Sequence, residues 1–111
     1  MTATMLDEET IERVKREIYE ALRGVDDPEL GVNLVDLGLI YGIQLTPEGF
    51  VTIRMTLTTP GCPMHESLAD GVGAALAHIP ELTGGEIELV WEPRWTPERL
   101  TPEGRRLLGL A

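Results

Sequence analysis

The residue with the clearest chemical potential is Cys62, the single cysteine of this 111-residue chain. It lies in Thr58-Thr59-Pro60-Gly61-Cys62-Pro63, after a strand-like apolar alternation and before a helix-like pattern. If Pro63 is the first helical residue, Cys62 is the N-cap, with its sulfur near unpaired backbone N–H groups. Such a position favours the thiolate, the form that attacks electrophiles and binds metal ions. We therefore predict an activated thiol at a strand-to-helix turn. The alternative is that Cys62 packs as a small hydrophobic residue.

Two further residues with acid–base or ligand chemistry, His65 and Glu66, fall in the first turn after Cys62. A Cys–His pair can act as nucleophile and base, or as two metal ligands. The sequence offers no second Cys or His cluster to complete a zinc site, and no third group to orient a catalytic histidine. A cysteine-dependent enzyme stays an open hypothesis, but we expect a protein without turnover of its own. Thr58 and Thr59 either cap the turn or donate hydrogen bonds to the sulfur.

Acidic residues gather in a long loop over residues 25–38, where Asp27, Glu29 and Asp36 are candidates for a functional surface. They could act as ligands or position a partner. The alternative is ordinary turn chemistry, in which Asp side chains accept local backbone N–H groups. A non-repetitive connection of this length is usually functional or covers the core.

The charge balance limits the classes of partner. Nineteen acidic and nine basic residues give a net charge of −10, which leaves no basic stripe for nucleic acid and disfavours an anionic membrane surface. No apolar run reaches the ~18 residues of a membrane-spanning helix, and the N-terminus does not resemble a signal peptide. A lone cysteine is typical of a reducing compartment. We predict a cytoplasmic chain that forms a single domain over residues 1–111.

The elements that must position these residues follow from the apolar periodicity. We expect a compact two-layer α+β domain in the order α-β-β-α-β, with a three-stranded mixed sheet and two main helices on one face, followed by a short C-terminal helix. Thr52, Arg54 and Thr56 are expected on the outer face of the second strand, and Trp91 on the inner side of the third. The expected ranges are a helix at 6–23, strands at 39–45 and 51–57, a helix from 63 to 79, a strand at 86–91 and a closing helix near 101–109. Val14, Ile18 and Leu22 lie on the apolar face of the first helix. The first two strands are expected to form a hairpin through the turn Thr46-Pro47-Glu48-Gly49, with alternating apolar residues at 39, 41, 43 and 45 and at 51, 53, 55 and 57. Thr101 is the expected N-cap of the closing helix.

Several motifs, in order and at matching spacing, resemble the small iron–sulfur assembly proteins of the PaaD/SufT type, whose fold is similar to the C-terminal domain of NifU scaffolds. They are Asp27-Pro28-Glu29, residues 33–41, Met55-Thr56-Leu57-Thr58-Thr59-Pro60-Gly61-Cys62-Pro63 and Pro93-Arg94-Trp95-Thr96. The resemblance runs from about residue 10 to the end. It implies a role in iron–sulfur protein maturation, assisting cluster assembly or delivery to client apoproteins. Cys62 is then the reactive or ligating thiol, and Asp27, Glu29 and Asp36 belong to the same functional surface.

One difference from NifU scaffolds limits the number of thiolate ligands that the chain can offer to a cluster. Those proteins carry a Cys-x-x-Cys pair, whereas His65 stands at the second position here. One thiol per chain cannot hold a cluster through four thiolates, so the resemblance implies at most a transient cluster bound through Cys62, for example in a homodimer. The expected partners are client iron–sulfur proteins or assembly machinery. The alternative is an adaptor that docks a multicomponent oxygenase or another client, with Cys62 only structural.

Overall fold

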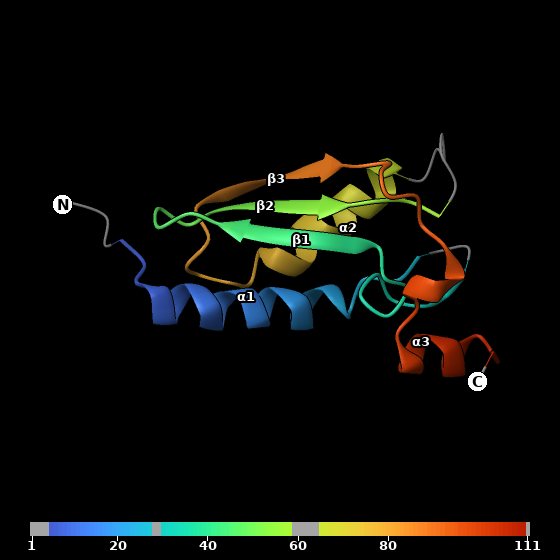
Figure 1. The fold of residues 1–111 in the computed structure, drawn as a ribbon. Coiled ribbons are helices and arrows are strands. Elements are labelled where there is room, and N and C mark those ends of the chain that lie inside the picture. Colours follow the sequence, from blue (N-terminus) through green and yellow to red (C-terminus); the bar gives the residue numbers. More distant parts are fainter. Residues whose placement is uncertain (1–4, 28–29, 59–64, 111) are drawn as a thin grey trace.

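The computed structural model describes residues 5–27, 30–58 and 65–110, apart from the side chains of residues 65–67. The element order agrees with the predicted α-β-β-α-β arrangement and its closing helix (Figure 1). The elements are α1 (Glu8–Leu22), β1 (Ile40–Leu45), β2 (Phe50–Met55), α2 (His65–Leu76), β3 (Gly84–Leu89), the 3-10 helix η1 (Pro97–Arg99) and α3 (Pro102–Leu107).

The sheet is mixed and has the order β1-β2-β3. β1 and β2 form the predicted antiparallel hairpin, and their turn ends at Gly49, whose φ of 94° favours glycine. β3 lies parallel to β2, with Ile53 opposite Ile87. A parallel neighbour requires a crossover connection, which α2 supplies.

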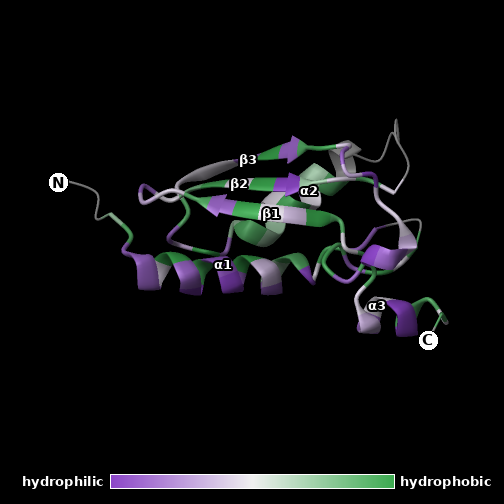
Figure 2. Ribbon diagram, in the orientation of Figure 1, coloured by the Kyte–Doolittle hydropathy of each residue, from purple (hydrophilic) through white to green (hydrophobic). Residues whose placement is uncertain are grey.

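Both main helices cover one face of the sheet, as predicted. The α1 residues Val14, Ile18 and Leu22 are fully buried, in one core cluster with the inward residues of the sheet and of α2. The ribbon of α1 alternates between purple and green bands, as an amphipathic helix does (Figure 2). The other face of the sheet carries exposed polar side chains such as Arg54 and Glu86. No helix among the described residues is long and apolar enough to cross a membrane.

Besides element bounds that differ by one to three residues, as where α2 ends at Leu76 rather than at residue 79, three details differ from the sequence prediction. Thr56 is buried rather than outward-facing, because β2 ends at Met55 and the Thr56 amide donates to Leu39 O at 2.9 Å. β3 begins at Gly84 and ends at Leu89, so Trp91 lies beyond the strand and is 42 % exposed. A register shift between Ile40 and Gly42 breaks the expected regular alternation at the start of β1.

Candidate functional site

The structure describes the residues that flank the predicted strand-to-helix turn. Thr58, which is partly buried, follows β2, and His65 and Glu66 are the first two residues of α2. Cys62 and Thr59 lie outside the described residues, as does Glu29 in the acidic loop. The predicted helix start at Pro63 also lies outside them. The N-cap position of Cys62 therefore stays a prediction.

The topology brings the other candidates to one end of the molecule, which we call the site end: residues 25–27 and 30–38, Thr58, the start of α2, and the segment 91–110 (Figure 1). Because β2 and β3 are parallel, both finish there, and antiparallel β1 begins there. The C-terminus of α1 leads into the loop at the same end. Residues far apart in the sequence thus share one surface region.

Asp27 is 6 % exposed and forms hydrogen bonds with other residues of the same loop. Its amide donates to Val32 O at 2.9 Å, and its Oδ1 accepts from the Leu30 amide at 3.2 Å. A neighbouring backbone bridge joins Asp26 to Asn33. These contacts are the local turn chemistry that the sequence left open, and they fix the shape of the loop.

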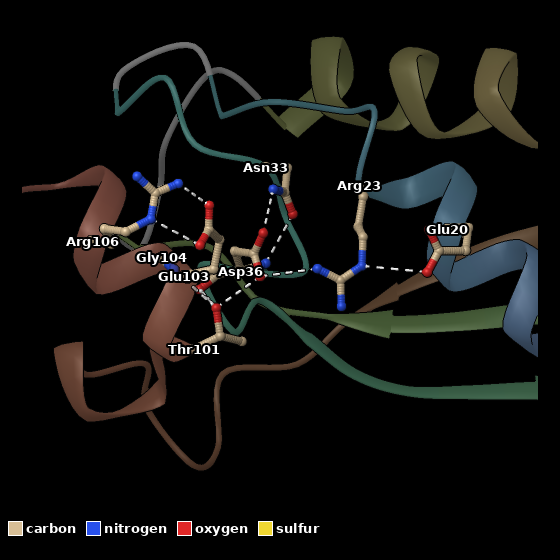
Figure 3. Close-up of polar contacts among 8 residues, drawn as sticks. All are labelled: Glu20, Arg23, Asn33, Asp36, Thr101, Glu103, Gly104 and Arg106. Carbon is tan, nitrogen blue, oxygen red and sulfur yellow. Dashed lines mark hydrogen bonds and ion pairs between the residues drawn. The ribbon is translucent and has the colours of Figure 1, made fainter.

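Asp36 lies at the centre of a polar network among the described residues of the site end (Figure 3). Its side chain is 5 % exposed and accepts from Asn33 Nδ2 at 2.6 Å, Thr101 Oγ1 at 2.7 Å and Arg23 Nη1 at 3.1 Å. The three donors come from the loop, from the cap of α3 and from the residue that ends α1. A buried carboxylate requires such partners. Asp36 therefore joins three segments of the fold.

The C-terminal segment packs on the loop through the backbone as well. The Thr101 amide donates to Asp36 O at 3.0 Å, and Trp95 Nε1 donates to Leu37 O at 2.6 Å. Thr101 also caps α3, as predicted, by accepting from the Gly104 amide at 3.0 Å. A Cβ on Gly104 would stand 2.3 Å from Asp36 O, so only glycine permits this approach.

Sequence reasoning missed Arg23, Asn33 and Trp95 as contributors, and it assigned Thr101 only a capping role. The Asn33-x-x-Asp36 spacing was an available signal, because the Asp36 amide donates to Asn33 Oδ1 at 2.9 Å in a local turn. The contacts of Arg23 and Thr101 with Asp36 join residues that are distant in the sequence, so no local sequence pattern predicts them.

The environment of Asp36 acts on its pKa in two directions. Burial raises the pKa of the carboxyl group. The hydrogen bonds from Asn33 and Thr101, together with the positive charge of Arg23, outweigh that effect and hold the pKa below its ordinary value of 3.8. The carboxylate is thus ionised at neutral pH, and its oxygens accept hydrogen bonds from these three donors.

Acid is therefore expected to weaken the site end. Because the folded-state pKa of Asp36 is lowered, its stabilisation is present above the ordinary value of 3.8 and is lost as the pH falls below that value and through the lowered folded-state pKa. We expect the free energy of unfolding to fall more steeply below about pH 5 in the wild type than in Asp36→Asn. Urea unfolding at a series of pH values measures the two slopes; Asp7 and Glu81, whose pKa values are also lowered, contribute equally to both proteins, whereas the Glu103 pKa loses the raising effect of the Asp36 charge in the variant. Equal slopes would contradict the assignment.

A comparison with protein families decides the relationship that the motifs suggested. The profile of the family described as "Iron-sulfur cluster assembly protein" matches residues 15–89. The chain belongs to this family.

Two relatives match over nearly their full length. The chain is 41 % identical over 99 residues to the Fe-S protein maturation auxiliary factor YitW of Bacillus subtilis, covering 89 % of this chain and 97 % of that protein. It is 42 % identical over 87 residues to the Fe-S protein maturation auxiliary factor SufT of Staphylococcus aureus, covering 78 % and 99 %. The crystal structure of a domain of unknown function from Bacillus anthracis has a TM-score of 0.84 at 36 % identity, covering 90 % of this chain and 95 % of that one.

The relative that corresponds to the oxygenase-related alternative matches over a smaller share of its length. An Escherichia coli protein that is provisionally assigned to the 1,2-phenylacetyl-CoA epoxidase is 33 % identical over 93 residues. Those residues are 83 % of this chain but only 55 % of that protein. The similarity to that protein therefore spans about half of its length, whereas the similarity to the maturation factors spans nearly all of theirs.

The described residues do not by themselves fit an iron–sulfur cluster. In the part of the chain that the structure describes, no three His, Cys, Asp or Glu side chains are placed to hold a metal ion together. The carboxylate of Asp36 is already engaged by three donors. A complete ligand set for a cluster would therefore need residues 28–29 or 59–64, the side chains of residues 65–67, the chain ends, or a second protein.

Proposed function

We propose that this protein is an accessory factor in iron–sulfur protein maturation, which assists the assembly of clusters or their delivery to client apoproteins and has no turnover of its own. The observation that carries the proposal is the similarity to maturation auxiliary factors over nearly the whole length of both chains. The adaptor alternative has less support, because its counterpart matches over only about half of its length.

In this proposal Cys62 is the working thiol. It is the single cysteine of the chain, and the described residues on either side of it, Thr58 and His65, lie at the site end. Thr59, His65 and Glu66 support it from the same turn. Glu29 belongs to the neighbouring loop surface.

Asp27 and Asp36 serve the site by fixing that loop rather than by binding metal. Both are buried, and their carboxylates accept hydrogen bonds from within the site end. Through Thr101, Asp36 also holds the C-terminal segment in place.

The cluster is cargo rather than a resident cofactor. One thiol per chain leaves most ligand positions of an iron–sulfur cluster unfilled. We propose that Cys62 shares a transient cluster with a second thiol, from another copy of the chain or from the client or assembly protein that receives or supplies it. A reducing cytoplasm would suit this role, because a lone thiol stays reduced there.

The proposal is tested by adding the purified chain to a [4Fe–4S] dehydratase that has been prepared without its cluster, in the presence of a cysteine desulfurase, iron and a scaffold protein. We expect dehydratase activity to be restored faster with the chain than with an equal concentration of serum albumin. Anaerobic reconstitution of the chain with iron and sulfide, followed by visible absorption and size analysis, shows in parallel whether cargo binding accompanies dimer formation. An unchanged rate of dehydratase activation would contradict the proposed role.

A further inference from the structure

β3 forms an open edge of the sheet in the described part of the chain, since it pairs only with β2 (Figure 1). The Val90 amide donates to Met55 O at 2.9 Å, so even-numbered residues of β3 direct their main-chain groups toward β2. Gly85, Ile87 and Leu89 therefore present their N–H and C=O groups to the open side. Such a row of donors and acceptors is a template for another strand.

A groove runs beside this edge, between β3 and α2, with a volume of about 600 Å³. Its α2 wall includes the small residues Ala69 and Gly73 beside Val72 and Leu76, and Ile87 contributes an apolar side chain from β3. A Cβ on Gly73 would meet no atom within 4 Å. The inner face of a strand added to β3 would thus find open apolar space.

The outer face of the same edge is acidic. Glu86 and Glu88 are both exposed. Glu88 has a half-exposed Arg54 at 3.4 Å, whereas no cation among the described residues pairs with Glu86, whose Oε1 lies 3.5 Å from Thr52 Oγ1. A neighbouring strand would place its outward side chains directly opposite these carboxylates.

This charge pattern selects the occupant. A second copy added antiparallel to β3 would set Glu86 and Glu88 against the same residues of its partner, and like charges in such positions are destabilising. The net charge of −10 adds to that repulsion. A strand with lysine or arginine on its outer face would instead form ion pairs there.

We propose that the β3 edge and the adjoining groove bind an extended segment of a partner protein in which apolar and basic side chains alternate. The segment adds as a strand beside β3, with its apolar side chains in the groove and its basic side chains over Glu86 and Glu88. Because β3 finishes at the site end, the bound segment leads toward that end. The site requires no contribution from Cys62 and goes beyond the proposed maturation chemistry.

The test uses the full chain, isotopically labelled for NMR, and a capped octapeptide that alternates valine and lysine. We expect saturable binding, with the largest amide shifts at Gly85, Ile87 and Leu89. Glu86→Lys is expected to weaken binding about tenfold or more. The matched charge reversal Glu12→Lys, on an exposed part of α1, should leave binding nearly unchanged at about 0.15 M salt.

A second variant tests the groove without disturbing the fold. Gly73→Leu places a side chain in open space and raises helix propensity, so stability should hold while peptide binding is lost. An octapeptide alternating serine and lysine, with the same charge, should bind at least about tenfold more weakly because it buries no apolar surface. Shifts confined to another surface, equal binding of the two peptides, or full binding by both Glu86→Lys and Gly73→Leu would overturn the proposal. So would a concentration-dependent dimer that protects the β3 amides, which would assign the edge to a second copy.

Discussion

Replacing Asp36 by alanine is expected to lower the free energy of unfolding by about 3 kcal/mol, since charge-assisted hydrogen bonds are lost and buried donors are left without an acceptor. The carboxylate accepts from Asn33, Thr101 and Arg23. Arg23 is 44 % exposed and can turn to water, so the cost falls mainly on Asn33 and Thr101. Urea unfolding at pH 7 measures the change.

Asp26→Ala is the matched control for this prediction. Asp26 lies in the same loop but is exposed, and its removal should change the free energy of unfolding by no more than about 0.5 kcal/mol. A double-mutant cycle with Thr101→Val should give a coupling free energy of about 1 kcal/mol, because the two side chains share a hydrogen bond. Equal effects of Asp26→Ala and Asp36→Ala, or additive effects of Asp36→Ala and Thr101→Val, would contradict the central place of Asp36 in the network.

Replacing Cys62 by serine is expected to reduce client activation by about tenfold or more, since even the loss of an outer-shell partner costs a metal site that much. Serine is similar in size to cysteine and is a favourable residue at the N-cap position predicted for Cys62, so the fold should be retained. The two variants are therefore expected to change different quantities: Asp36→Ala lowers stability, whereas Cys62→Ser lowers client activation at nearly constant stability.

Local patterns predicted most of the fold. The apolar spacing of Val14, Ile18 and Leu22 defined α1, and the alternation of Val51, Ile53 and Met55 with a Pro-Glu-Gly turn before it defined the hairpin. Both are confirmed. The pattern did not say whether β3 lies beside β1 or β2, because that choice depends on where the α2 crossover packs. Thr56 was misplaced because alternation was extended past the last residue of the strand.

The site was less accessible to sequence reasoning. Asp27 and Asp36 were singled out, but their burial was not foreseen, because the partners that make burial possible are distant. Thr101 is 65 residues from Asp36 along the chain. Charge alone suggested a solvated surface loop, whereas the structure uses one of its acids to join α1, the loop and α3. The roles of Cys62, Thr59 and Glu29 stay predictions, since these residues lie outside the described ranges.

The most direct measurement is the initial rate at which the cluster-free [4Fe–4S] dehydratase gains activity with wild-type chain, with Cys62→Ser, and with wild type whose single thiol has been alkylated by iodoacetamide. Thermal unfolding of each protein shows that the fold is kept. The account predicts that the wild type accelerates activation and that both altered proteins lose about tenfold or more of that acceleration. Equal rates for wild type and Cys62→Ser would contradict the claim that the protein works through this thiol.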